Sequence, residues 1–334
     1  MRDNANSVKI IGYLYDISKM SLRTSGPDSK HPGTEYIKGE MNIAVDEKGL
    51  NVIPVRFNYM TAFYSKKDKN GNPKPNRTFA TIKKMIEEPK TWLKDGKDGA
   101  YMVEISGSLD LNDFISSDNK RVSAPCVTGS FLDVVQQIDP DESARNKFVA
   151  DMVITRVNHV DADPEKNIEK DYTIIGGAVF SYYKELLPME FKVTNPEGMN
   201  LFEDMDISNS EPVYIKVWGH IYNTTIKTSR TEESAFGEAA VTTYERKTRD
   251  WVVDGAAKVP YEYGEEDVLT ADELIKATQD REIHWATVQK NHDDYIASKN
   301  APKTTDNVVN NMASPTAKVQ AGAFKFFYQN NKEF

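Results

Sequence analysis

Residues 36–59 read YIKGEMNIAVDEKGLNVIPVRFNY, and this stretch decides the fold. Apolar and polar residues alternate on both sides of the turn signal at residues 46–49. Since successive side chains of a β-strand point to opposite faces of a sheet, the alternation predicts a hairpin with one buried face. Ile53, Val55 and Phe57 fall on that face, and Arg56 and Asn58 fall on the other.

The segments around this hairpin complete an order of elements. We expect one strand before the hairpin, a helix after it and then two more strands, at Val8–Ile17, Thr78–Glu88, Tyr101–Asn112 and Arg121–Val135. Pro89 ends the helix pattern because proline cannot continue a helix. Three strands, a helix and two strands form the order of the OB-fold, a five-stranded Greek-key barrel.

The same order recurs further along the chain. Expected strands lie at Phe148–Val160, Asp171–Tyr183, Leu186–Val193, Pro212–Ile226 and Thr242–Val253, with a short helix at Gly198–Met205. The two third strands share a proline between apolar residues, at Pro54 and Pro188, and the two fourth strands share a glycine, at Gly107 and Gly219. These matches, in the same order, favour an internal duplication.

We therefore expect a mainly β chain of two tandem OB-fold barrels, followed by a C-terminal helix and a flexible tail. The expected ranges are 1–136 for the first barrel, 147–256 for the second, 267–299 for the helix and 300–334 for the tail. Thr270 and Glu273 have the spacing of a capping box at the start of the helix. The tail ends in an aromatic cluster at residues 324–328 and a terminal Phe334.

Composition excludes several classes of protein. The chain has 334 residues and a single cysteine, Cys126, so an internal disulfide framework and a cysteine-based zinc site are excluded. No local motif indicates a nucleophile with its base, a helical histidine pair or a phosphate-binding loop. We expect no catalytic residue, no metal and no cofactor. Without a signal peptide or a membrane-spanning stretch, we expect a cytoplasmic protein.

Charge is distributed unevenly along the chain. The net charge is −9, but residues 1–134 hold 20 Lys/Arg against 17 Asp/Glu. Residues 135–298 hold 17 Lys/Arg against 32 Asp/Glu. A mildly basic first third is able to present a positive surface to an anion although the whole molecule is acidic.

Basic residues are interleaved with aromatic ones around the barrel strands and loops. Single-stranded nucleic acid is bound by cations along its phosphates and by aromatic rings under its bases. In OB-folds, strands 2 and 3 and the loops between strands carry this contact. Candidates in the first unit are Tyr13, Lys19, Arg23, Lys30, Tyr36, Lys38, Arg56, Tyr59, Tyr64, Lys66, Lys67, Lys69, Lys74 and Arg77.

The second unit has its own candidates, among them a long loop expected between Lys227 and Arg249. They are Tyr182, Lys184, Trp218, Tyr222, Lys227, Arg230, Arg246, Lys247 and Arg249. Three readings stay open alongside binding. The lysines after Tyr64 would also be consistent with a solvated loop that binds nothing. Trp218 would also fit in the barrel core or at a domain interface, and Tyr13 would also fit as a cap on the barrel.

Four stretches resemble bacteriophage-type single-stranded-DNA-binding proteins built on OB-folds, over residues 7–135. They are Ile10–Leu14, Tyr36–Gly39, Asn51–Phe57 and Val103–Leu109. The resemblance implies a non-enzymatic protein that binds single-stranded DNA, or RNA, largely independently of sequence. Such a protein coats and protects single strands during DNA replication or recombination, in the host cytoplasm if a phage encodes it.

The end of the chain departs from the related bacterial family. That family recruits replication or recombination proteins through an acidic tip with a terminal Pro-Phe, whereas this chain ends in Asn330–Phe334 without the acidic run or the proline. DNA, a neighbouring subunit and the chain's own barrel are therefore alternative contacts for the tail.

Two further functions remain as alternatives. A structural or assembly protein, in a virion or a replisome, would use the OB barrels as protein-docking modules, and the acidic second half favours it. A nucleic-acid enzyme would hold a metal ion on the carboxylates of Glu203, Asp204 and Asp206.

Overall fold

The computed structural model describes most of the chain as one mainly β body with a C-terminal helix. It describes residues 5–27, 29, 31–65, 67–163, 165, 168–208, 211–232, 240–262 and 270–300. For residues 226–232, 240–247, 271 and 300 it describes the backbone alone. Lys30, Lys66 and the tail after residue 300 lie outside the described residues.

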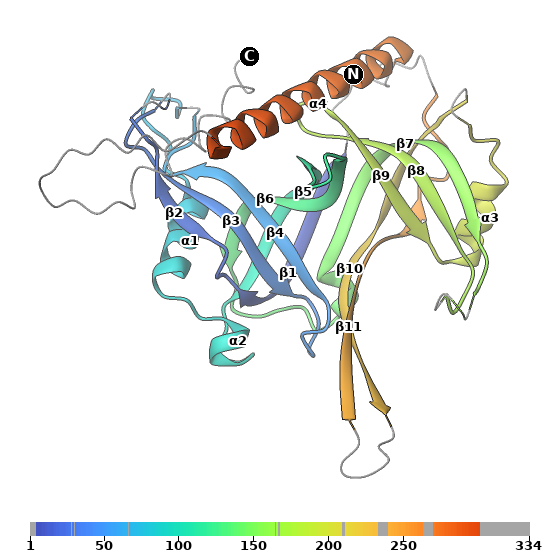
Figure 1. The fold of residues 1–334 in the computed structure, drawn as a ribbon, viewed down its shortest axis with the longest axis horizontal. Coiled ribbons are helices and arrows are strands. Elements are labelled where there is room, and N and C mark those ends of the chain that lie inside the picture. The colour runs from blue at the N-terminus through green and yellow to red at the C-terminus, as the bar shows by residue number, and fades with distance from the viewer. Residues whose placement is uncertain are drawn as a thin grey trace, which may run out of the picture.

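The strands and helices predicted from the sequence occur in the predicted order, and β2 and α2 are present in addition (Figure 1). The elements of the first half are β1 (Asn6–Asp16), β2 (Ser21–Thr24), β3 (Glu35–Ala44), β4 (Val52–Thr61), α1 (Arg77–Glu87), α2 (Trp92–Asp95), β5 (Met102–Ile115) and β6 (Arg121–Val134). A 3-10 turn, Glu142–Ala144, leads into the second half. There the elements are β7 (Asn146–Val160), β8 (Tyr172–Phe180), β9 (Leu186–Val193), α3 (Pro196–Glu203), β10 (Val213–Glu232), β11 (Ala240–Ala256) and α4 (Ala271–Asn300).

Strand pairing forms two rings within one sheet. In the first half, β1 pairs with β3, β3 with β4, β4 in parallel with β6, β6 with β5, and β5 with β1. In the second half the corresponding order is β7, β8, β9, β11 and β10, again with one parallel pair, β9 with β11. The pairing of β1 with β7 joins the rings. The arrangement is OB-like, because the third and fifth strands of a five-stranded OB-fold pair in parallel, as β4 and β6 do in the first half and β9 and β11 do in the second.

The registers of the two halves correspond residue by residue. Val8 pairs with Gly107 and Phe148 pairs with Gly219, while Val8 and Phe148 pair with each other. A bulge immediately precedes each of the two glycines. A Cβ atom on Gly107 would overlap the carbonyl oxygen of Thr128, and one on Gly219 would overlap the carbonyl oxygen of Val252. The glycines shared by the fourth strands therefore allow the same close backbone approach in each half.

A pair of asparagines repeats the correspondence. The side-chain amide of Asn6 accepts from the backbone N–H of Leu109 at 2.8 Å and donates to its carbonyl at 3.1 Å. Asn146 makes the same two contacts with the backbone of Ile221, accepting at 3.3 Å and donating to the carbonyl. Each amide thus satisfies the backbone polar groups of one fourth-strand residue beside the bulge.

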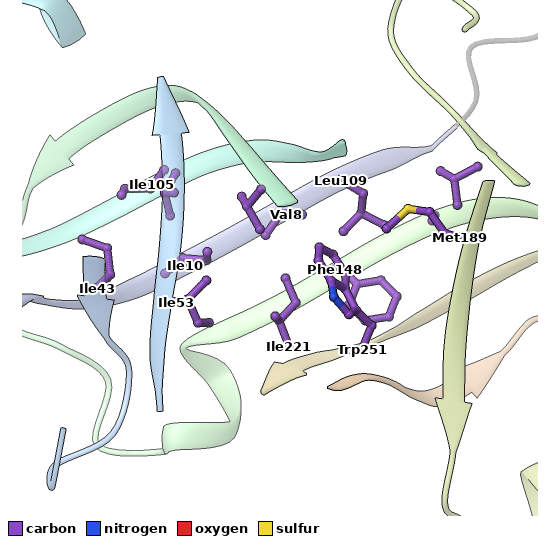
Figure 2. Close-up of a cluster of buried hydrophobic side chains, with 14 of the residues drawn as sticks. Val8, Ile10, Ile43, Ile53, Ile105, Leu109, Phe148, Met189, Ile221 and Trp251 are labelled. Atoms are coloured by element: carbon purple, nitrogen blue, oxygen red, sulfur yellow. The ribbon is translucent and has the colours of Figure 1, made fainter. Parts of the chain in front are cut away.

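One apolar core runs through both rings (Figure 2). Val8 and Ile10 of β1 lie beside Phe148 of β7, and all three are buried. The ring of Phe148 lies 5.3 Å from that of Phe191, between centroids. Because the two halves share this interior, burial of apolar surface stabilises them together.

Helix α4 lies across both halves (Figure 1). Its start has the predicted capping box, in which Thr270 Oγ1 accepts from the N–H of Glu273 at 3.2 Å and Glu273 Oε2 accepts from the N–H of Thr270 at 3.0 Å. The buried Ala277 belongs to a cluster with Phe180, Leu186 and Tyr214 of the second half. None of the described helices is long and apolar enough to cross a membrane.

Further along α4, charged side chains reach the β5–β6 hairpin of the first half. Arg281 makes a bidentate ion pair with Asp113 at 2.6 and 2.7 Å, and His284 Nε2 lies 3.0 Å from the same carboxylate. The pKa of Asp113 is held well below its usual range because the hydrogen bonds from His284, Arg281 and Ser123 outweigh the desolvation of the carboxylate. Helix α4 therefore ties the two halves together by apolar contacts at one end and a buried charge pair in the middle.

The structure corrects two expectations about loops. The polar sequence of Ser18–Thr34, between the first two expected strands, indicates a loop, but this segment contains β2, whose residues Ser21–Thr24 pair with Glu35–Lys38 of β3. The long loop expected from Lys227 to Arg249 is instead the distal part of the β10–β11 hairpin, which pairs continuously from Gly219–Val253 to Glu232–Ala240. This hairpin projects beyond both rings (Figure 1). β2 and the distal β10–β11 hairpin were not predicted, because their polar, threonine-rich sequence lacks the alternating apolar residues that indicate a strand.

Candidate nucleic-acid interface

A basic pocket lies on the outer face of the first ring. Its volume is about 390 Å³. It is lined by Lys19, Lys38, Gly39, Glu40, Pro54, Arg56, Asn58, Asn112, Ala124, Pro125, Cys126 and Arg249. Four cationic side chains face a single carboxylate there, and so the pocket is suited to an anionic ligand.

Strand alternation places these side chains. In β4, Ile53, Val55 and Phe57 are buried inside the ring, and the residues between them therefore face outwards. Arg56 on β4 lies directly opposite Glu40 of β3 and beside Thr128 of β6. The pocket is thus formed by the outward positions of β3, β4 and β6, with Asn112 at the edge from β5.

Positive charge accumulates in the pocket. The pKa of Lys38 is lowered, first by burial of the ammonium group and then by repulsion from Arg23 and Arg56. Lys19 is partly compensated, since its Nζ lies 3.0 Å from Glu40 Oε1. An anion that enters the pocket would relieve the repulsion among Lys38, Arg23 and Arg56.

The thiol of Cys126 in the pocket stays protonated at neutral pH. Burial, followed by the nearby charge of Asp110, raises its pKa to about 11. A hydrogen bond with Arg56 acts in the opposite direction and is outweighed. A thiol with such a pKa is a poor nucleophile, and Cys126 acts here as lining of the pocket.

The second half contributes Arg249 to this first-half pocket. Arg249 Nη1 of β11 donates to the carbonyl oxygen of Pro125 on β6 at 3.1 Å. The base of the β10–β11 hairpin is held against the first ring by a bridge between Asn51 and Thr224 and by Asn223, whose N–H donates to Asn51 Oδ1 at 2.9 Å. The pocket is therefore complete only when both halves are present.

Two predicted aromatic residues pack together near the pocket. The rings of Tyr36 and Tyr59 lie 4.5 Å apart, and Tyr59 Oη lies 3.2 Å from Ser25 Oγ. Arg23 forms a hydrogen bond with Tyr36. Tyr36 is only 4% exposed, so its ring is packed against its neighbours and is closed to a base in this arrangement. Tyr59 has a positive φ of 37°, at the point where β4 turns away.

The lysine-rich segment after β4 is an ordered turn. Asp68 accepts from the backbone N–H groups of Asn70 and Asn72 at 2.8 Å each, and Lys74 Nζ lies 5.4 Å from the centre of the Tyr64 ring. The predicted residues here are exposed, and they are Lys67, Lys69, Lys74 and Arg77. They surround the turn and the start of α1, and none of them lines the pocket.

Tyr13 lies apart from the pocket. Its ring meets that of Trp92 edge to face at 5.5 Å, and Lys97 Nζ lies 5.6 Å above it. Tyr15 contacts the same tryptophan at 6.1 Å. Both tyrosines of β1 thus pack against α2, which favours the capping interpretation of Tyr13 over base stacking.

The predicted residues of the second half are scattered. Tyr182 and Tyr183 are 87% and 79% exposed at the turn after β8, next to Lys184 with a positive φ of 64°. Trp218 and Tyr222 lie on β10 and are 42% and 41% exposed, so neither is core. For Lys227, Arg230, Arg246 and Lys247 the backbone alone is described, in the distal hairpin. Among the second-half predictions whose side chains the structure describes, Arg249 is the one that lines the pocket.

Some of the pocket was not predicted from the sequence. Asn112 and the segment Ala124–Cys126 were missed as site residues. The available signal was strand alternation, because Asn112 and Ala124 are outward positions that pair across β5 and β6. The contact of Arg249 with Pro125 had no local signal, since 124 residues separate the two.

One group of side chains in the second half has metal-ligand types. His159, Asp161 and Asp171 have ligand atoms within 4.8 Å of one another, and all three are exposed. Glu203 Oε1 lies 2.9 Å from His159 Nδ1 and raises the pKa of that histidine through a hydrogen bond. His159 Nε2 also lies 3.5 Å from Asp161, and the carboxylate of Asp171 accepts from the backbone N–H of Ala162 at 2.7 Å.

Comparisons with known proteins identify a family. None of the curated proteins matches the chain. Among solved structures, a deletion mutant of the single-stranded DNA binding protein from Thermus aquaticus is similar over 80% of this chain and 100% of its own, at 12% sequence identity and a TM-score of 0.43. The sequence model of the YorF family matches residues 4–291. The chain therefore belongs to the YorF family.

Proposed function

We propose that this protein is a non-enzymatic, largely sequence-independent single-stranded-DNA-binding protein. We also propose that its two rings are tandem five-stranded OB-fold barrels. The closed pairing order, the parallel third and fifth strands and the matching registers support that architecture.

One observation carries the functional proposal: the pocket shared by both halves. Lys38 and Arg56 of the first ring lie on the two strands whose face binds nucleic acid in OB-folds, and Arg249 joins them from β11 of the second ring. Their side chains line one pocket together with Lys19, although the chain as a whole is acidic. A phosphate backbone is the ligand that matches several cations along a strand.

Exposed cations next to the pocket provide further contacts for the phosphates of the bound strand in this proposal. Arg23 lies close enough to Lys38 to lower the pKa of that lysine. The ordered turn after β4 adds Lys67, Lys69 and Lys74, and Tyr64 supplies a ring for stacking. Stacking on an aromatic ring contributes about 1–3 kcal/mol per base and accepts any base.

In the cell, we propose that the protein coats and protects single strands during replication or recombination in the cytoplasm. RNA is a second ligand with the same phosphate chemistry. We assign the tail after residue 300 the contact with replication or recombination proteins. The coating role follows from the resemblance of residues 7–135 to phage-type binding proteins, and the tail contact from the terminal Phe334 that the chain shares with the related bacterial family.

Fluorescence anisotropy tests the proposal. Labelled dT oligonucleotides of graded length and a duplex of the same length are titrated at two salt concentrations. We expect tighter binding to the single strand, and an affinity that falls as salt rises, because bound phosphates release counterions. Equal affinity for the duplex, or no binding at low salt, would contradict the proposal.

A docking module is the second candidate, and the ion-paired surface of the second half favours it. Arg156 contacts Glu190, and Lys192 Nζ lies 3.9 Å from Asp250. This face holds compensated charge, as many protein-binding surfaces do. Light scattering after size exclusion would then show an oligomer or a stable protein complex, with no affinity for oligonucleotides.

A further inference from the structure

We infer that the first-half pocket takes one whole nucleotide of a bound strand and favours a purine base, through Asn58 and Asn112. This inference rests on the proposed function and adds a base preference to it at that site.

The pocket has the size of a ligand site. Its volume of about 390 Å³ falls within the range of roughly 300–1,000 Å³ that is typical of small-molecule sites. A flat cationic face that only tracks phosphates would need no such volume. The lining strands therefore leave room for a base and its sugar as well as a phosphate.

Two carboxamides on the wall of the pocket have no hydrogen-bond partner among the described residues. Within the described residues, the side chains of Asn58 on β4 and Asn112 on β5 make no hydrogen bond, although Asn112 is half-buried. Other asparagines of the fold behave differently, since Asn6 and Asn146 each satisfy a backbone N–H and carbonyl. A half-buried amide without a partner costs free energy until water or a ligand satisfies it.

The chemistry of the wall matches purines. A carboxamide offers one donor and one acceptor, which fit the N6 and N7 atoms of adenine, and a guanidinium fits the O6 and N7 atoms of guanine. Asn58 and Asn112 supply the first kind of group, and Arg56 and Arg249 supply the second. Pyrimidines lack N7 and so offer these groups a poorer edge. Lys38, which also lines the pocket, places a positive charge beside the phosphate.

The first experiment compares one substitution within a constant strand. Anisotropy is measured with a 15-residue dT oligonucleotide and with versions that carry a single central dA, dG or dC. We expect dA and dG to bind about fivefold more tightly than dC or dT, the lower end of the discrimination that a bidentate base contact gives. The double variant Asn58→Ala/Asn112→Ala should lose the advantage of dA, retain that of dG, which depends on Arg56 and Arg249, and keep its affinity for plain dT within about twofold.

Controls separate the possible failures. Asn200→Ala changes an exposed asparagine on α3 in the other half and should leave the purine preference intact. Asn112→Leu keeps the side-chain volume and serves if the alanine variant is unstable. Calorimetry on the unchanged protein with dAMP, dTMP and inorganic phosphate needs no variant, and the strongest heat is expected with dAMP.

The outcomes distinguish this inference from the proposed function. Tight binding of dT with equal affinity for all four central bases would overturn the purine inference and leave single-strand binding in place. A preference for dA that persists in the double variant would also overturn it. Loss of binding to every oligonucleotide by the unchanged protein would remove the proposed function and this inference together.

Discussion

The two halves have matching interiors and different outer faces. Val55 of β4 pairs with Met41 of β3, and the corresponding Met189 of β9 pairs with Gly177 of β8. The side chains of Val55, Met41 and Met189 are all buried. The next outward residue is Arg56 in the first half but Glu190 in the second. The pairing of the strands in each ring thus depends on the side chains that point inwards. The side chains that point outwards can differ between the halves without disturbing that pairing.

The difference in charge follows from neighbours as well as from residue type. Within the described residues, Arg56 makes no ion pair with a carboxylate and lines the pocket instead. At the corresponding place, Glu190 is held by Arg156, and Lys192 lies 4.1 Å from the centre of the Tyr172 ring. Arg56 on the outer face of the first half is therefore placed to pair with an anionic ligand, whereas Arg156 and Lys192 on the outer face of the second half already lie next to carboxylates. This comparison can be tested at three levels.

The largest effect should come from the shared glycines. Gly107→Ala and Gly219→Ala each place a Cβ atom onto the carbonyl oxygen of the neighbouring strand. Forcing the backbones apart is expected to lower the free energy of unfolding by about 3 kcal/mol in each variant. Urea denaturation measures both. If one substitution were harmless, the two bulges would not be structurally equivalent.

A smaller effect should separate the two faces. The variant Lys38→Gln/Arg56→Gln is expected to bind single-stranded dT about 30-fold more weakly, a loss of about 2 kcal/mol. Removing two phosphate contacts should also reduce the slope of log affinity against log salt by about 1.4.

The matched control removes the same two residue types from the second half. Arg156→Gln/Lys192→Gln should bind within about twofold of the unchanged protein, because both side chains are already engaged by Glu190 and Asp250. Equal losses in the two double variants would show that binding is not confined to the first face.

The smallest effect should be a pH dependence at the joint between the halves. A hydrogen bond to Asp254 raises the pKa of His220, with a further contribution from the Ser143 carbonyl, 2.7 Å from His220 Nε2. A pKa raised on folding stabilises the protein fully below the unfolded value near 6.5, and the contribution is lost as pH rises through the folded value. Thermal unfolding should therefore show a larger decrease in Tm between pH 6 and 8.5 in the unchanged protein than in His220→Asn. The same pH dependence in both would exclude this contact.

Much of the strand framework was predictable because each ring buries one face of each strand. Alternation in Asn51–Tyr59 gave β4 to within two residues, and the capping pair gave the start of α4. β2 and the distal β10–β11 hairpin were missed, because their residues pair without an apolar face. The helix segment expected at 267–299 is observed as Ala271–Asn300 within the described residues.

The site was predictable only where local pattern decides orientation. Lys38 and Arg56 followed from alternation on adjacent strands, and both line the pocket. Tyr13 has the same alternation, but contact with Trp92, 79 residues away, determines its surroundings. Pairings over such distances depend on how the halves and helices pack, and a single sequence carries no local signal for them.

The joint between β1 and β7 has a consequence for how the chain behaves when it is cut. Backbone hydrogen bonds from Asn6–Ile10 to Asn146–Ala150, together with the common interior around Phe148, do not depend on the connecting peptide. A protease that nicks the connection between residues 135 and 145 would leave two fragments that stay docked as a heterodimer. Neither fragment alone has the complete apolar interior, and so we expect the two repeats to lose their structure together when the chain unfolds.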